Sequence, residues 1–234
     1  MEELKTVILA AGKGTRMKSD LPKVVHKVMG KPMVEHVINA AKQAGSHKIC
    51  LVVGYQADAV KEQVKSAAEY VLQEEQLGTG HAVKCAKDFI GENGEILILC
   101  GDTPLIMGKT LKKFVEYHRE NKNTVTVLSA YINDPTGYGR IIRDRYGRFI
   151  KSVEHKDATE NEKLSKEINS GMYIFNAKAL SGALDELNTN NAQGEYYLPD
   201  TLTILKKKGL QVDAMALSSP DEIAGVNTIE QLGE

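Results

Sequence analysis

Residues 6–17 read Thr-Val-Ile-Leu-Ala-Ala-Gly-Lys-Gly-Thr-Arg-Met, an apolar β-rich run that passes directly into a glycine-rich loop. A short run that is apolar on both faces is typical of a parallel strand covered by helices on each side. Open α/β sheets bind their ligands at the carboxyl ends of such strands. This stretch therefore predicts the class of fold and also the region of a binding site.

The first half of the chain repeats this pattern. Two further apolar runs occupy residues 48–53 and 95–100. Segments with helical periodicity lie between and after the runs, at residues 33–44, 57–68, 81–89 and 108–121. Alternating strands and helices imply right-handed βαβ crossovers, so we predict an α/β fold with a mostly parallel sheet.

The second half follows a different pattern. We predict a β-hairpin from residues 140–144 and 149–154, which flank the turn sequence Arg-Tyr-Gly-Arg. Residues 155–166 are charged and predict a loop or an exposed helix. The other predicted elements are strands at 124–132, 171–176 and 211–217 and helices at 177–187 and 196–208. Without a linker between the halves, we interpret these elements as insertions on the same sheet, within one domain at residues 1–234.

Composition excludes several classes of protein. The 234 residues carry 30 Lys and Arg against 31 Asp and Glu, which disfavours a nucleic-acid binder that works by bulk charge. Cys50, Cys85 and Cys100 lack zinc-binding spacing and are expected to be buried free thiols in a reducing compartment. The sequence shows no signal peptide and no apolar stretch of about 18 residues. We therefore expect a cytoplasmic protein that does not enter a membrane.

The glycine-rich loop at residues 9–17 predicts close approach to a ligand. Its alanines and glycines leave the backbone accessible, and its N–H groups can hold phosphate oxygens. Lys13, Arg16 and Lys23 add positive charge nearby. The loop lacks the last glycine of GxGxxG and the Gly-Lys-Ser/Thr ending of a Walker A motif, so a plain tight turn is the alternative.

Two more segments combine small residues with polar ones. Residues 73–81 follow a predicted strand and precede a helix, which suits either a ligand or a helix cap formed by Thr79. Asp102 follows the apolar run at 95–100 and either caps a turn or holds a divalent cation such as Mg²⁺. No Ser/His/Asp set indicates a nucleophilic hydrolase.

Together these motifs resemble the sugar-nucleotide pyrophosphorylases, and most specifically the N-acetylglucosamine-1-phosphate uridylyltransferases. The matching segments run through the chain in order, at residues 9–17, 21–24, 76–82, 101–105, 134–141, 153–157, 168–171, 191–198 and 225–227. The resemblance implies a Rossmann-like α/β fold of the nucleotide-diphospho-sugar transferase type, with a mostly parallel sheet, helices on both faces and small β insertions. Pro199 stands where the family pattern has threonine.

The resemblance also implies a role for each matching residue. Nucleotide contacts are implied for Leu9, Ala10, Ala11 and Gly12, and uracil recognition for Gln73, Gly78 and Thr79. Sugar contacts are implied for Gly139, Glu154 and Asn169, with Cys100 and Gly101 beside the ligand. The implied catalytic residues are Arg16 and Lys23 on the phosphates and Asp102 on Mg²⁺, which it shares with Asn227.

The implied reaction transfers UMP from UTP to N-acetyl-α-D-glucosamine 1-phosphate, giving UDP-N-acetylglucosamine and pyrophosphate for peptidoglycan synthesis. A uridylyltransferase for another sugar phosphate and an inactive nucleotide-sugar-binding domain remain alternatives. Family proteins usually continue into a trimeric β-helix of hexapeptide repeats that transfers an acetyl group. This sequence stops at Glu234, so we expect neither acetyl transfer nor the trimer, and a monomer instead.

Overall fold

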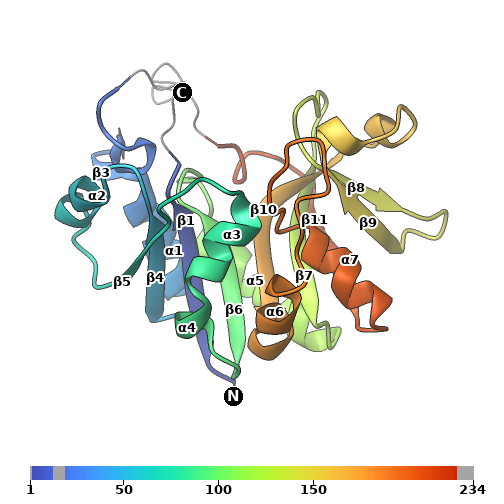
Figure 1. Ribbon diagram of the computed structural model, residues 1–234, viewed down its shortest axis with the longest axis horizontal. Coiled ribbons are helices and arrows are strands. Elements are labelled where there is room, and N and C mark those ends of the chain that lie inside the picture. The colour runs from blue at the N-terminus through green and yellow to red at the C-terminus, as the bar shows by residue number, and fades with distance from the viewer. Residues whose placement is uncertain (1, 13–18, 226–234) are drawn as a thin grey trace.

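A central β-sheet runs through the computed structural model, which describes residues 2–12 and 19–225 (Figure 1). In these residues the sheet has nine strands, of which seven follow the order β11-β7-β10-β6-β1-β4-β5, while β8 and β9 branch from β10. The strands are β1 (Leu4–Ala10), β4 (Lys48–Val53), β5 (Glu69–Leu72), β6 (Glu95–Cys100), β7 (Val125–Tyr131), β8 (Arg140–Arg143), β9 (Phe149–Val153), β10 (Glu167–Asn176) and β11 (Val212–Leu217). A separate small ribbon pairs β2 (Lys27–Val28) with β3 (Lys31–Pro32).

The sheet is mostly parallel, as predicted. Strand β1 lies between β4 and β6 and is parallel to both. Strand β10 reverses this direction, because it pairs antiparallel with β6 on one side and β7 on the other. The second half of the chain thus adds its strands to the sheet of the first half, which confirms the interpretation as insertions.

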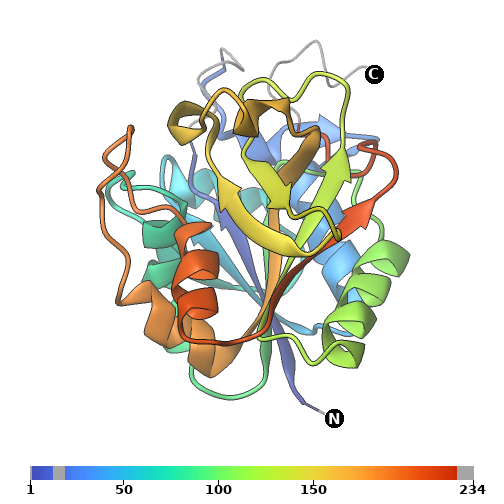
Figure 2. The same ribbon diagram turned by 90° about the vertical axis from the view of Figure 1, so that its right-hand side faces the viewer.

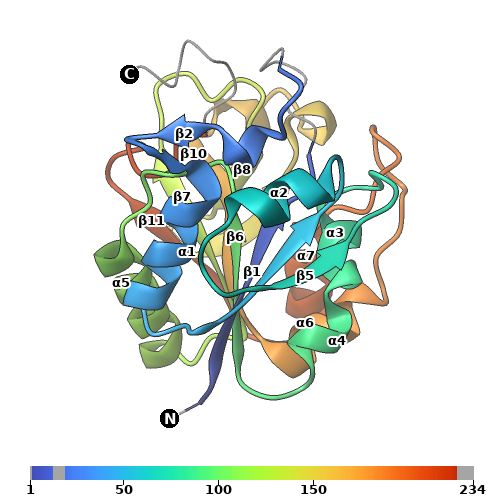
Figure 3. The same ribbon diagram turned by 90° about the vertical axis from the view of Figure 1, so that its left-hand side faces the viewer.

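Helices cover both faces of the sheet, as Figures 2 and 3 show from opposite sides. One face carries α1 (Met33–Gln43), α2 (Ala57–Gln63) and α5 (Gly108–Glu120), and the other carries α3 (Thr79–Cys85), α4 (Lys87–Ile90), α6 (Ala177–Leu184) and α7 (Asp200–Lys207). Successive strand residues point to opposite faces, so Ile8 joins the first core and Val7 the second. This explains why β1, β4 and β6 are apolar on both faces beyond their first residues.

Some predicted element ends are wrong. The helix predicted at 57–68 ends at Gln63, because the Glu35 carboxylate accepts hydrogen bonds from the Ser66 N–H and hydroxyl and holds the next residues extended. The helix predicted at 81–89 is two helices, α3 and α4, that meet at Ala86. The helix predicted at 196–208 begins only at Asp200.

The remaining insertions differ in detail from the prediction. Strand β10 begins four residues earlier than predicted, at Glu167, and changes register between Asn169 and Tyr173. The charged segment before it forms two short 3-10 turns, η3 (His155–Asp157) and η4 (Glu162–Leu164). Among the described residues, no helix combines the length and the apolar character needed to cross a bilayer.

Candidate active site

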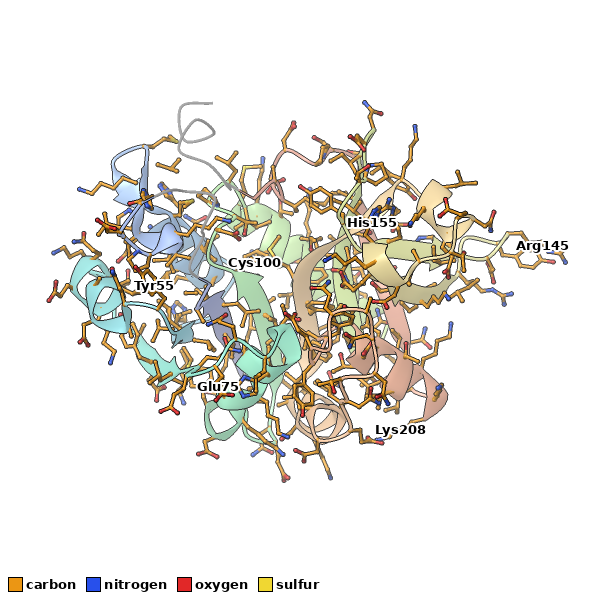
Figure 4. All side chains as sticks on the ribbon, turned by 45° about the horizontal axis from the view of Figure 1, so that its top comes forward. Tyr55, Glu75, Cys100, Arg145, His155 and Lys208 are labelled. Carbon is orange, nitrogen blue, oxygen red and sulfur yellow. The ribbon has the colours of Figure 1, made fainter. Side chains whose placement is uncertain are left out.

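A cavity of about 210 Å³ opens at the carboxyl ends of β1 and β6. Six predicted site residues line it together, namely Leu9, Thr79, Cys100, Gly139, Glu154 and Asn169. They come from both halves of the chain, and Figure 4 shows Cys100 near the middle of the molecule, far from Arg145 on the β8–β9 hairpin. The juxtaposition agrees with the predicted site, while the binding role of each residue stays a prediction.

Sequence reasoning missed several residues of the cavity wall, namely Gly137, Tyr138, Ser170, Gly171, Tyr173 and Leu198. All of them except Tyr173 lie within motifs that the resemblance had identified, although no role was assigned to them there. Pro199, the departure from the family pattern, also lies on this wall.

A second hollow continues from the first toward Asp102. Both hollows are lined by the same four residues, namely Cys100, Gly137, Tyr138 and Ser170. The second hollow also reaches Ile223 and Gly225. The described residues therefore form a continuous groove from the end of β1 to Asp102.

Asp102 forms an ion pair with Lys23, whose Nζ lies 2.7 Å from Asp102 Oδ2. Lys23 begins the 3-10 turn η2 (Lys23–Val25), which is held in place by the buried side chains of Val24 and Val25. The turn after β6 is closed by Thr103, whose N–H and hydroxyl both donate to the Cys100 carbonyl. Within the described part of the chain Asp102 thus pairs with a cation, and the alternative that it caps this turn is not supported.

Close packing at Gly101 brings the ends of β1 and β6 together. The Gly101 N–H donates to the Leu9 carbonyl at 2.9 Å. A Cβ at this position would lie 3.0 Å from both that carbonyl and Val24 Cγ1. Glycine at this position therefore lets the end of β1 and the segment that carries Asp102 lie side by side at the groove.

The groove offers a modest site for a metal ion. Among the described residues, no group of three His, Cys, Asp or Glu side chains is placed to hold one. Asp102 supplies a single carboxylate that is about one third exposed, which fits Mg²⁺, since this ion takes one or two carboxylates and completes its shell with water and phosphate. Arg16 and Asn227 lie outside the described residues. Asn227 follows Gly225 by two positions, and a Cβ at Gly225 would lie 3.8 Å from Asp102 Oδ2.

The segment from Gln73 to Thr79 is shaped by contacts with Tyr196. Gly78 has φ +111°, and a Cβ there would lie 2.6 Å from the Tyr196 carbonyl, so only glycine fits. Gly78 is also the N-cap residue of α3, and the Thr79 hydroxyl accepts a hydrogen bond from the Leu198 N–H. The alternative of a helix cap by Thr79 is therefore wrong.

The start of the glycine-rich loop is anchored from the neighbouring strands. The Ala11 carbonyl accepts a hydrogen bond from Gln76 Nε2 at 3.1 Å. Gly54 follows β4 at a point where a Cβ would lie 3.0 Å from that carbonyl. Gln76 was part of a recognised motif, but its anchoring of residues 9–12 was not predicted. These contacts fix the backbone at Ala11, directly after β1, while Ala10, Ala11 and Gly12 do not line either hollow among the described residues.

The sugar-binding residues predicted by the resemblance lie in an acidic part of the cavity. Burial raises the pKa of Glu154, and the carboxylates of Asp157, Asp200 and Glu195 raise it further. A Cβ at Gly139 would lie 3.3 Å from Glu154 Oε1, so glycine leaves room beside this carboxylate.

The side chain of Asn169 forms three hydrogen bonds within the protein. Its Nδ2 donates to Ser152 Oγ and Tyr173 Oη, and its Oδ1 accepts from the Gly171 N–H. Gly171 has φ +79° and interrupts the register of β10. Asn169 thus shapes the cavity wall in addition to lining it.

The three cysteines are free thiols, as expected, but only Cys50 is fully buried. Burial raises the pKa of Cys50 to about 12. Burial and the nearby Asp102 raise the pKa of Cys100 to about 12, so this thiol is neutral in the groove. Cys100 therefore offers a small uncharged surface to a ligand and no reactive thiolate.

Comparisons with known proteins identify the family of this chain. The pattern of the family described as nucleotidyl transferase matches residues 5–217. The bifunctional protein GlmU of Clostridioides difficile (strain 630) is 54% identical over 230 residues, which are 98% of this chain and 50% of that protein. The GlmU protein of Streptococcus mutans serotype c is 52% identical over 222 residues, 94% of this chain and 48% of that protein. The chain thus spans about half the length of these curated relatives.

A solved structure shares the fold. It is a putative glucose-1-phosphate thymidylyltransferase from Bacillus anthracis in complex with a sucrose, with a TM-score of 0.76 and 23% sequence identity. The alignment covers 98% of this chain and 92% of that one. This similarity supports the mostly parallel α/β architecture described above.

Proposed function

The chain belongs to the nucleotidyl transferase family, and we propose that it transfers UMP from UTP to N-acetyl-α-D-glucosamine 1-phosphate. The products are UDP-N-acetylglucosamine and pyrophosphate. The observation that carries the proposal is the single cavity in which the nucleotide motif at Leu9, the base motif at Thr79 and the sugar motif at Glu154 meet. Relatives at about 50% identity, all named GlmU, support the same assignment.

The proposed reaction does not require a general base. A sugar phosphate is largely dianionic near neutral pH, because its second pKa is about 6. One of its oxygens attacks the α-phosphorus of UTP, forming a new P–O bond while the bond to the β-phosphate breaks and pyrophosphate leaves. The main obstacle is repulsion between two polyanions, so positioning and charge neutralisation provide most of the catalysis.

Lys23 supplies this neutralisation from a fixed position. Its ammonium group lies 2.7 Å from the carboxylate of Asp102, which lines the groove, and it would face the phosphates in the proposed complex. Arg16 adds a second cation from the glycine-rich loop. Asp102 and Asn227 would hold Mg²⁺, which offsets charge on the α-phosphate and on the departing pyrophosphate when bound.

Measuring pyrophosphate release across a panel of nucleotides and sugar phosphates tests the proposal. We expect release with UTP and N-acetylglucosamine 1-phosphate, and little with CTP or glucose 1-phosphate. A preference for another sugar phosphate would support the alternative uridylyltransferase. UDP-N-acetylglucosamine binding without any release would support the inactive binding domain.

We also propose that residues 1–234 act as a monomer without acetyltransferase activity, since they contain no hexapeptide repeats. Incubation with acetyl-CoA and glucosamine 1-phosphate should give no acetylated sugar. Light scattering should give a mass near 25.7 kDa. Acetyl transfer by this polypeptide, or a trimer in solution, would contradict the corresponding expectation.

A further inference from the structure

The side chain of Gln73 is held in one orientation by two acceptors. Its Nε2 lies 3.3 Å from the Gly78 carbonyl oxygen and 3.0 Å from Nδ1 of His81. A carbonyl only accepts hydrogen bonds, so the nitrogen of the amide must face Gly78. The same nitrogen reaches His81, and both of its hydrogens are therefore used inside the protein.

This arrangement leaves the amide oxygen for a ligand. Gln73 is 3% exposed, and among the described residues none donates a hydrogen bond to its Oε1. Gln73 follows β5 at the carboxyl edge of the sheet, where its N–H donates to the Val53 carbonyl at 2.7 Å. A Cβ at Gly54 would lie 3.0 Å from the Ala11 carbonyl and 3.1 Å from the Gln73 carbonyl, so this glycine lets the backbone of Gln73 lie close to that of Ala11.

We propose that His81 is a positioning residue for base selection, which fixes the Gln73 amide so that its oxygen faces the nucleotide base. An acceptor at this point selects a base edge that donates. The imide N3–H of uracil donates a hydrogen bond. The corresponding N3 of cytosine carries a lone pair, so it and the Gln73 amide oxygen would be two acceptors facing each other. The inference rests on the proposed function, because it assigns the source of the UTP preference within the same site.

His81 acts through Gln73 and not by touching the base. Its ring lines a different pocket, between α3 and α6, together with Leu77, Lys84, Leu184 and Tyr196. Nδ1 accepts a hydrogen bond only when the ring is neutral and carries its proton on Nε2. Without this acceptor, one amide hydrogen loses its partner and the amide is free to turn its nitrogen toward the ligand.

The test compares the binding of UTP and CTP, each with Mg²⁺, by isothermal titration calorimetry. Wild-type protein should prefer UTP, and His81→Ala should reduce the ratio of the two affinities by about three- to tenfold, as expected for one lost hydrogen bond. His81→Phe keeps a ring in the pocket but has no acceptor, and should give the same result if His81→Ala fails to fold. Lys84→Ala lies on the same helix and pocket and should leave the ratio unchanged.

A double-mutant cycle separates positioning from a general structural role. In a Gln73→Ala background, replacing His81 should cause no further change in the UTP-to-CTP ratio, because the amide through which it acts is gone. An unchanged ratio in both His81 variants would overturn the inference, as would an equal effect in the Gln73→Ala background. Failure of pyrophosphate release with every substrate pair would instead overturn the proposed function, since the binding ratio is measured without turnover.

Discussion

At the scale of single residues, the Lys23–Asp102 pair should serve catalysis more than stability. Ion pairs near the surface contribute about 0–1 kcal/mol. Lys23 is 12% exposed, but its partner Asp102 is 31% exposed and stays hydrated when the lysine is removed. We expect Lys23→Ala to shift the melting temperature little but to lower kcat at least about tenfold, the loss of ~1.4 kcal/mol in the transition state. Lys48→Ala removes the ion pair with Glu3, far from the groove, and should leave kcat unchanged. A large loss of melting temperature with normal kcat would make Lys23 structural.

Glu154 should lower the stability of the fold at neutral pH while it contributes to ligand binding. Its pKa is raised, chiefly by burial, so the folded state binds a proton more readily than the unfolded chain. The resulting stabilisation is present below the unfolded pKa and is lost as pH rises through the folded pKa. We therefore expect Glu154→Gln to be more stable than wild type at pH 7 to 8, with a difference that shrinks toward pH 4.

Thermal denaturation of both proteins across this pH range checks that expectation. The same substitution should weaken binding of the sugar phosphate, because Glu154 lies on the cavity wall. A stability difference that does not change with pH would show that the charge on Glu154 carries no cost in the fold.

At the scale of elements, the segment before Gly225 is tied to the start of α5. Glu222 accepts hydrogen bonds from the Met107 N–H and the Thr110 hydroxyl, both at 2.9 Å, and Ile223 is buried beside it. Glu222→Ala should destabilise the fold by about 1 kcal/mol, as for a lost helix cap. It should also raise the Mg²⁺ concentration needed for half-maximal activity, because it frees the chain that leads to Asn227.

Urea denaturation and a Mg²⁺ titration of activity measure these two effects. Asp221→Ala changes the adjacent exposed carboxylate and serves as the control. An unchanged Mg²⁺ requirement in Glu222→Ala would mean that this contact does not position the metal site.

The bounds of helices and strands were predicted correctly where burial on both faces of the sheet fixes the hydrophobic pattern. They were predicted wrongly where contacts with distant parts of the chain set the end of an element. The strands predicted at 48–53 and 95–100 have those bounds in the structure, because their apolar residues pack against a core on each face of the sheet. The start of α7 was misplaced, since the backbone of Tyr196 bonds to Leu77 and Gly80 and cannot join the helix. Such a contact joins segments over 100 residues apart, and local periodicity carries no information about it.

At the scale of the whole molecule, the site exists because β10 inserts antiparallel between β6 and β7. This insertion brings Asn169 to the same cavity as Cys100 and Leu9, which lies near the end of β1. The resemblance predicted six of the residues that line the cavity, but hydrophobic patterning alone gives neither strand order nor direction. The orientation of Gln73 by His81 also escaped prediction, because it depends on which side-chain atoms meet.

The metal ion should bind well to the folded molecule only when the nucleotide is also present. A single carboxylate makes a weak Mg²⁺ site, since this ion dehydrates reluctantly and needs phosphate oxygens to complete its shell. Ligands that bind only the folded state stabilise it by about 2.7 kcal/mol at 100 times Kd, and each kcal/mol raises the melting temperature of a chain this long by roughly 2–4 °C. We expect Mg²⁺ alone to change the melting temperature hardly at all, and UTP with Mg²⁺ to raise it by roughly 5–10 °C.

Differential scanning fluorimetry under three conditions separates the contributions to this shift in melting temperature. The conditions are Mg²⁺ alone, UTP with EDTA, and UTP with Mg²⁺. Asp102→Ala should remove most of the part that requires Mg²⁺ and most of the activity, while keeping a small response to UTP itself. Asp144→Ala, on the β8–β9 hairpin away from the groove, should respond like wild type. A full Mg²⁺-dependent shift in Asp102→Ala would place the metal elsewhere, because no other described carboxylate lines the groove beside Gly225.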